Sequence, residues 1–175
     1  TGTAVQTAGI PPSSAVNVGA ITINDNLSVM NNLGPASGTY NSTLSSLNIG
    51  GITETGTPRS VTFNSTGAVG NTAMVSASTY SGGTSVLGGR VAMAAGNVLG
   101  TGPVTVSSGA QVQLATTDTT VTNDFVLNGN GWAEAVSPTG RGALSIGANN
   151  TTTARFHTFS GGIQIDGPGV SSGTS

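Results

Sequence analysis

The sequence predicts an all-β chain in which short strands stack as the coils of a solenoid. Charged residues make up only 6% of a chain that is 35% hydrophobic. Helix-forming residues never cluster at a helical period, and the 28 glycines interrupt most windows of helical length. Short alternating apolar and polar runs recur instead between corners rich in Gly, Asn and Ser, which is typical of stacked coils.

The low charge does not indicate disorder, because disordered chains combine low hydrophobicity with high net charge, and here the net charge is -2. The basic residues are Arg59, Arg90, Arg141 and Arg155, too few to hold a phosphate backbone, so we expect no nucleic-acid partner. No run approaches the ~18 apolar residues of a membrane-spanning helix, so we expect no membrane insertion. The lack of Cys excludes disulfides and suits a protein that crosses membranes unfolded.

Each predicted strand places apolar side chains on one face and Ser, Thr, Gln or Arg on the other. In chain order the predicted strands are residues 20–23, 27–30, 47–49, 60–63, 73–75, 85–87, 90–93, 104–106, 111–114, 125–127, 143–146, 155–159 and 163–165. The apolar phase of these runs predicts a core that contains Val86, Val91, Val104, Val106, Val112, Leu114, Leu144, Ile146, Ile163 and Ile165.

A repeat is clearest in residues 79–114, which hold two strand-corner-strand pairs. The second strands of these pairs begin at Arg90 and at Gln111, and the spacing between them is close to the length of one solenoid coil. We therefore predict a single β-solenoid over residues 16–167. Residues 1–15, with Pro11-Pro12, form an extended arm or linker in this interpretation, and residues 168–175 form a flexible or linking tail.

The run TYSGGTSVLGGRVAMAAGNVLGTGPVTVSSGAQVQL, residues 79–114, resembles the autotransporter-associated β-strand repeat, also called the passenger-associated transport repeat. It keeps the aromatic T-Y-S-G-G-T start, the G-G corner and the L-G-T-G-P-V-T-V ending, and departs at Arg90, where the family more often has Thr. A weaker echo covers residues 141–167. The resemblance implies a right-handed parallel β-helix in a secreted bacterial passenger or surface fibre, outside the cell or on its surface, and it implies no chemistry.

Candidate catalytic acids are scattered. A carbohydrate-active enzyme on this fold would need two or three acids that converge on neighbouring coils. Only Asp118 and Asp124 lie close together among the six acids, which are Asp25, Glu54, Asp118, Asp124, Glu134 and Asp166. Asp at a β-corner normally serves the turn. We therefore expect a protein that is not an enzyme and has no catalytic residues.

Other motifs are incomplete. His157 has no second His and no Cys to make a zinc site, and alternation would place His157 and Arg155 outward with Phe156 inward. The run 161–166 resembles a calcium nonapeptide, but Gln164 stands where the third Gly is needed. We expect no metal and no other cofactor. Glycosylation sequons begin at Asn26, Asn41, Asn64, Asn149 and Asn150.

The function predicted from the sequence is that of a structural or adhesive extracellular segment, a unit of a surface fibre assembled head to tail with neighbouring units. The arm 1–15, which is uncharged, is a candidate to pair with the open β-edge of the next unit. Two alternatives remain open. One is a carbohydrate-active β-helix enzyme, and the other is an adhesin that binds a surface or glycan ligand through a groove around Trp132, which otherwise would cover apolar surface as a loop cap.

Overall fold

The computed structural model describes residues 4–7, 14–31, 45–65, 71–115, 118–133, 140–146 and 156–166. All regular structure in these ranges is β-strand, and every described strand pair is parallel. The prediction of an all-β chain is therefore confirmed. Parallel pairing requires the chain to cross over between neighbouring strands, so paired strands come from separate parts of the chain.

Sheet A contains seven described strands. In spatial order they are β1 (Ala4–Thr7), β4 (Leu27–Asn31), β7 (Val61–Asn64), the first half of β9 (Thr84–Met93), β10 (Val104–Val106), β13 (Phe125–Asn128) and β16 (Ile163–Asp166). The spatial order is also the chain order, so sheet A grows in one direction as the chain proceeds.

Sheet B contains six described strands in the same direction. They are β2 (Ser14–Val18), β5 (Ser45–Ile49), β8 (Asn71–Met74), the second half of β9, β11 (Ala110–Leu114) and β14 (Leu144–Ile146). The predicted strands 85–87 and 90–93 form one strand, β9, whose partner changes at the glycine corner. Gly88 pairs with β7 of sheet A, whereas Gly89 pairs with β11 of sheet B.

A third side joins sheet B back to sheet A. There β3 (Ile21–Ile23) pairs with β6 (Ile52–Glu54), and β12 (Thr119–Val121) pairs with β15 (His157–Phe159). Irregular segments continue this side between the two pairs, because Thr79 N–H donates to the Ile52 carbonyl (2.9 Å) and Ser78 N–H donates to the Asn97 carbonyl (3.0 Å).

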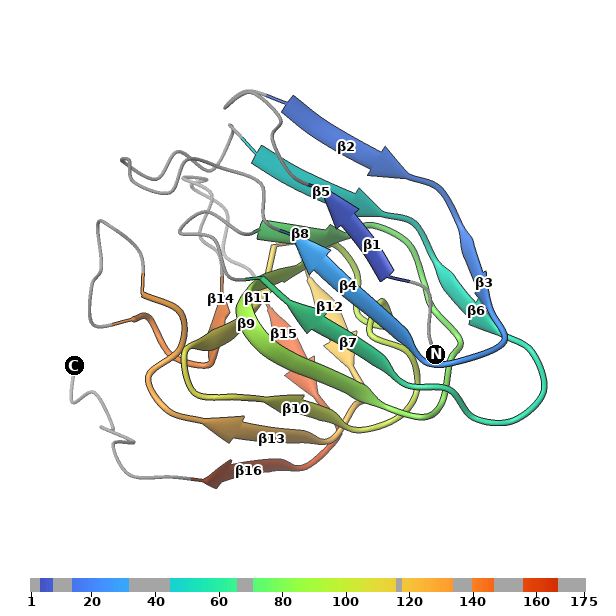
Figure 1. Cartoon of the computed structure of the whole chain (residues 1–175). Helices are drawn as coiled ribbons and strands as arrows, with labels where there is room; N and C mark the ends of the chain where they lie inside the picture. The colour runs from blue at the N-terminus through green and yellow to red at the C-terminus, as the bar shows by residue number, and fades with distance from the viewer. Residues whose placement is uncertain are drawn as a thin grey trace.

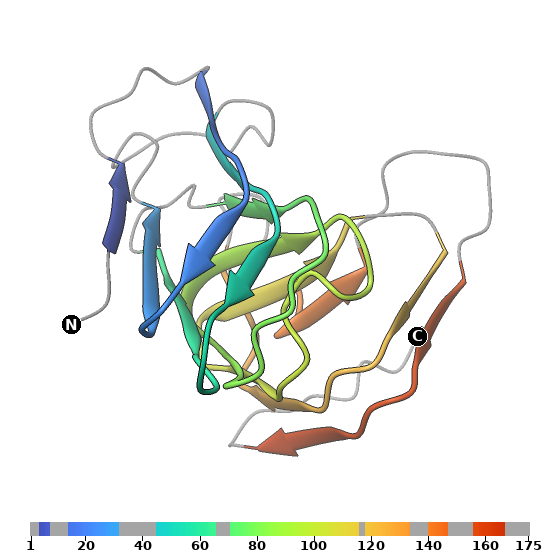
Figure 2. The same cartoon turned by 90° about the vertical axis from the view of Figure 1, so that its right-hand side faces the viewer.

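The chain visits sheet A, sheet B and the third side in this order and then returns to sheet A. We call the chain between successive strands of sheet A a pass. The passes differ in length, since the pass that ends with Val104 paired to Phe125 is much shorter than the next one, which ends with Phe125 paired to Ile163. Figure 1 shows the first strands and the last strands at opposite ends of the molecule, and Figure 2 shows the same arrangement from the side.

The core lies between sheets A and B and the third side, where inward side chains stack from pass to pass. Six of the ten predicted core residues are almost completely buried, which confirms the predicted phase of the central strands. They are Val86, Val91, Val104, Val106, Val112 and Leu114. Arg90 and Gln111, from which the repeat was predicted, are direct neighbours in sheet B.

The prediction of burial is wrong in the last pass. Ile146, Ile163 and Ile165 are 59%, 45% and 56% exposed, and Leu144 is only partly buried. Their phase is correct, because Ile146 pairs with buried Leu114, and Ile163 pairs with buried Phe125. They are exposed because β14 and β16 are the last described strands of their sheets, so no further described pass covers them.

Neighbouring passes approach closely at the corners. A Cβ on Gly161 would lie 2.1 Å from the Asn123 carbonyl oxygen, so only glycine fits there. Asn123 is buried and its amide donates to the Gly100 carbonyl (3.1 Å) and to the Gly102 carbonyl (2.8 Å) of the preceding pass. The corners are therefore held by side-chain hydrogen bonds as well as by the backbone.

Two strands lie in the range predicted as an extended arm, residues 1–15. The structure describes β1 at residues 4–7, where it pairs with β4, and β2 begins at residue 14 and pairs with β5. The predicted tail, residues 168–175, lies outside the described residues.

Candidate association surfaces at the two ends of the stack

Two of the acids that sequence analysis considered for catalysis, Asp118 and Asp124, serve corners between passes. The Asp118 carboxylate accepts a hydrogen bond from Phe156 N–H (2.7 Å), and the Asp124 carboxylate accepts one from Gly162 N–H (2.6 Å). Both bonds cross from one pass to the next, as the turn interpretation of these residues predicts. Glu134 lies outside the described residues, and within them no cluster of three or more His, Asp or Glu could hold a metal ion.

Glu54 accepts hydrogen bonds at both carboxylate oxygens at a corner. One carboxylate oxygen accepts a hydrogen bond from the Ser81 hydroxyl (2.6 Å), and the other accepts one from Arg59 N–H (2.6 Å). The hydroxyl bond from Ser81 and then the backbone bond from Arg59 lower the pKa of Glu54 from its ordinary value. The Glu54 carboxylate thus connects two successive passes by hydrogen bonds.

The predicted orientation of residues 156 and 157 is wrong. Phe156 is 73% exposed, whereas His157 is partly buried and lies in the same phase as Phe159, which packs against the core. Phe159 contacts Phe125 edge to face, with ring centroids 6.0 Å apart. The strand is shorter than predicted and begins at His157, so Phe156 belongs to the preceding corner.

The remaining sequence motifs lie on β16 and on exposed corners. Residues 163–166 form β16, in which the Gln164 amide donates to both carboxylate oxygens of Asp166 (3.0 Å each). Of the sequon residues, Asn26 accepts a hydrogen bond from Ser60 N–H (2.9 Å) at an exposed corner, and Asn64 ends β7. The other three sequon residues, Asn41, Asn149 and Asn150, lie outside the described residues.

Trp132 is not an exposed platform for a ligand. Its side chain is only 7% exposed, and the Arg90 guanidinium carbon lies 5.3 Å from the centre of the ring. That distance is within the range of a cation–π contact. Of the two alternatives, the exposed groove around Trp132 is not found. The side chain is buried, as the loop-cap interpretation expects, and it packs on Arg90.

Arg90, which contacts Trp132, belongs to a row of polar side chains on the outer face of sheet B. Asn71, Arg90 and Gln111 occupy neighbouring positions on β8, β9 and β11. The Arg90 Nε donates to Asn71 Oδ1 (3.2 Å), and the Gln111 amide donates to the Gly142 carbonyl (2.9 Å). Arg90 and Gln111 are nearly completely buried, since the Trp132 ring packs on Arg90 and Gln111 is bonded to Gly142. Sequence analysis missed this burial, since it depends on a segment that folds back over the sheet.

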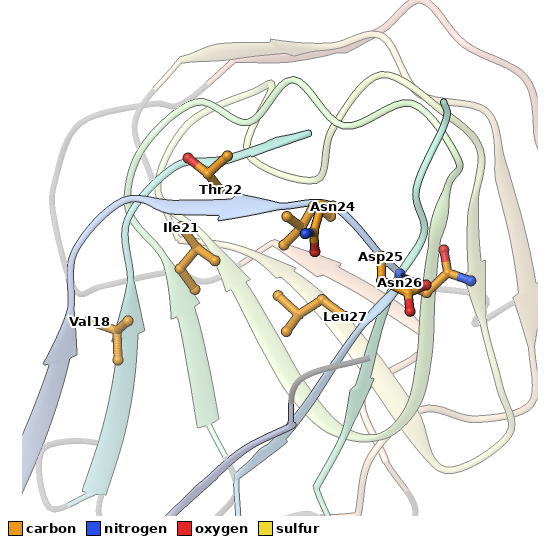
Figure 3. Close-up of a pocket in the computed structure, with 8 residues that line it drawn as sticks. Val18, Ile21, Thr22, Asn24, Asp25, Asn26 and Leu27 are labelled. Carbon is orange, nitrogen blue, oxygen red and sulfur yellow. Dashed lines mark hydrogen bonds between the residues drawn. The ribbon is translucent and has the colours of Figure 1, made fainter. Parts of the chain in front are cut away.

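The first end of the stack is hollow. A cavity of about 220 Å³ is lined by Val18 and by residues 21–27, which include β3 and the corner before β4. Figure 3 shows Ile21 and Leu27 directed into the space between the strands, with Asp25 and Asn26 at the turn. No other described strand lies beyond β2 in sheet B or beyond β3 on the third side.

The last end of the stack carries most of the exposed apolar side chains. Among the described residues, four of the six large hydrophobic residues that are clearly exposed belong to the last pass, namely Ile146, Phe156, Ile163 and Ile165. A second hollow, of about 310 Å³, lies along the paired strands β13 and β16 and is lined by residues 124–126 and 162–164. These exposed apolar side chains make this end a candidate association surface.

Comparisons with protein-family models, with curated proteins and with solved structures find no match to this chain. Within the described residues there is no helix of the length and apolar character that would cross a membrane. The candidate site is therefore defined by the geometry of the two ends alone.

Proposed function

We propose that the chain is a segment of a right-handed parallel β-helix with a structural role, and that such segments associate end to end into an extracellular fibre of a bacterial surface. The observation that carries this proposal is the cyclic order of the strands. Sheet A, sheet B and the third side are visited in turn by passes that stack in parallel, as in a solenoid. A right-handed crossover is the usual hand for parallel strands.

The two ends support association. In a solenoid the terminal coils expose unpaired backbone groups, which neighbouring units or caps must cover. Here the inward columns continue to both ends, where they are partly exposed at Ile21, Ile146 and Ile165. A contact between unlike ends need not close on itself, so it generates a filament rather than a symmetric dimer.

The alternatives are less well supported by the side chains. Buried Trp132 offers no exposed aromatic groove for an adhesin ligand, and Asp118 and Asp124 each accept a backbone hydrogen bond at a different corner. The proposed function therefore assigns these residues to the construction of the coils, with no catalytic role and no cofactor. Depolymerisation of a polysaccharide by the purified chain would contradict this assignment.

Electron microscopy of the purified chain, together with X-ray diffraction from aligned material, tests the proposal. We expect filaments whose diffraction shows a spacing of about 4.8 Å along the filament axis, because stacked passes place the strands perpendicular to that axis. A chain that remains monomeric at every concentration, by light scattering, would contradict end-to-end assembly. Filaments with strands parallel to the axis would contradict the solenoid.

A further inference from the structure

We propose that β1 is a self-capping strand, which in the free chain occupies the place beside β4 that β16 of a second copy takes in the assembled fibre. This inference rests on the proposed end-to-end assembly and specifies the joint. Assembly then requires β1 to leave its own sheet. The partner is a second copy of this chain. Its last pass supplies β14, β15 and β16, which can lie beside β2, β3 and β4 of the first pass.

The strand order carries the argument. The described chain begins on sheet A with β1 and ends on sheet A with β16, so sheet A has seven described strands and sheet B has six. If β16 of one copy met β1 of the next, two sheet A strands would follow each other. The stack would then lack one strand of sheet B and one strand of the third side at the joint.

Removing β1 from the joint restores the cycle. When β16 pairs directly with β4 of the next copy, β14 comes beside β2, and β15 comes beside β3. All three sides then continue in parallel with no missing strand, and the order A, B, third side is unbroken across the joint. Displacement of β16 would also restore the cycle, with β13 beside β1. It would leave the half-exposed Ile163 and Ile165 outside the joint, however, whereas displacement of β1 brings both residues into it.

The side chains at the two ends agree with this joint. On β4, Leu27 and Val29 face the core, and from the other side they pair with Val61 and Phe63. With the same phase, Ile163 would lie opposite Leu27 and Ile165 opposite Val29. The two half-exposed isoleucines would thereby enter the core columns of the next copy.

The other two sides match in the same way. Leu144 and Ile146 on β14 would lie opposite Val16 and Val18 on β2, whose side chains are partly buried and pack against the core. On the third side, Phe159 would meet the strand of Ile21, which lines the hollow at the first end. The hollow is thus the place into which apolar side chains of the last pass insert.

A disulfide between copies tests the joint directly. The outward residues Ser28 on β4 and Gln164 on β16 would become direct neighbours, with Cα atoms about 5 Å apart, within the range of a disulfide. The chain has no Cys, so the double variant Ser28→Cys/Gln164→Cys has a unique pair. We expect oxidised filaments to give a ladder of covalent multimers in denaturing gels. The control Thr105→Cys/Gln164→Cys should give none, because β13 lies between β10 and β16.

Deletion of residues 1–7 provides the second test. If β1 caps the chain, its removal should speed assembly about tenfold or more, which corresponds to ~1.4 kcal/mol of released pairing. Slower assembly after the deletion would overturn the capping role and make the arm a donor strand. Filaments that form without the Ser28–Gln164 cross-link would overturn the joint but keep end-to-end assembly. Absence of filaments from both the full chain and the deletion variant would overturn both.

A charge on β16 separates assembly from folding. Ile165→Asp should abolish filaments while the melting temperature of the monomer stays unchanged, because Ile165 is already half-exposed. Leu87→Asp is the matched control, since Leu87 has a similar exposure but lies in the middle of the stack. Equal assembly of the two variants would overturn the role of β16.

Discussion

At the scale of single residues, the stack depends on polar side chains that connect one pass to the next. The buried Tyr80 hydroxyl lies 2.6 Å from Thr84 Oγ1, which donates to the Leu99 carbonyl (2.9 Å). Because the one hydroxyl hydrogen of Thr84 goes to Leu99, Tyr80 must be the donor to Thr84. Burial raises the pKa of the Tyr80 phenol, so this donor keeps its proton.

Tyr80→Phe removes the first bond of this chain without removing the ring. We expect the free energy of unfolding to fall by about 0.5–1.5 kcal/mol, the net value of a buried hydrogen bond. Thr84→Val should cost more, because it also leaves the Leu99 carbonyl without this donor. Urea denaturation measures both variants. Thr105→Val, at an exposed hydroxyl, is the control, and a Tyr80→Phe variant no less stable than this control would contradict the donor role.

The hydrogen bonds to the Glu54 carboxylate predict a loss of stability in acid. Its folded pKa lies below the ordinary value of 4.5, so the carboxylate stabilises the fold above about pH 4.5, and this contribution disappears as the pH falls through the folded pKa. Thermal unfolding of the wild type and of Glu54→Gln measures this effect. We expect Glu54→Gln to melt lower at neutral pH and the difference to shrink below pH 4.5. A difference that is constant with pH would show that the charge is not responsible.

At the scale of strands, the position of a residue within the stack decides how much its side chain stabilises the fold. Val112 and Ile146 have the same inward phase, but Val112 on β11 is covered by β9 and β14, whereas Ile146 on β14 is covered on one side only by a described strand. Both residues stand in the apolar phase of an alternating run. Only the number of passes on each side differs.

This difference gives a paired prediction. Val112→Asp should destabilise the monomer by several kcal/mol, roughly 3 or more, because it buries an unpaired charge. Ile146→Asp should change monomer stability by less than about 0.5 kcal/mol, as expected for an exposed site. Chemical denaturation checks both values. Similar stability of the two variants would mean that β11 is not in the interior of the stack.

The sequence predicted strands best where alternation and repetition act together. Residues 104–106 form a strand as predicted, and the repeat offset that relates Arg90 to Gln111 is the true pairing in sheet B. Prediction failed where long-range pairing makes the strand. The strands β1 and β2 lie near Pro11-Pro12 in a range without a clear run, and β12 has a single apolar residue, Val121. Such strands form because a neighbouring pass offers a backbone edge.

The candidate surfaces were predicted less well than the strands. The sequence predicted head-to-tail association, but it placed Ile163 and Ile165 in the core and left open whether Trp132 is exposed or covers apolar surface. The error and the open alternative have the same cause, because burial here depends on which segment lies above a side chain. Alternation along one strand gives the facing direction and contains no information on that cover.

At the scale of the whole molecule, association should depend little on salt. The chain has a net charge of -2 and only 6% charged residues, so screening has little charge on which to act. We expect the assembly rate, followed by light scattering, to change by less than about twofold between ~0.05 M and ~0.5 M NaCl. A steep dependence on salt would indicate that the ends meet through ion pairs instead of apolar columns.

The unequal lengths of the passes suggest how such a chain evolves. The circuit from Val104 to Phe125 is short, whereas the circuit from Phe125 to Ile163 is nearly twice as long, although each adds one strand to sheet A. The longer pass therefore adds no further described strand to sheet A. In the proposed solenoid, duplication of residues 104–124 would insert one more layer, about 4.8 Å thick. The proposed architecture thus allows the length of the product to change in whole layers.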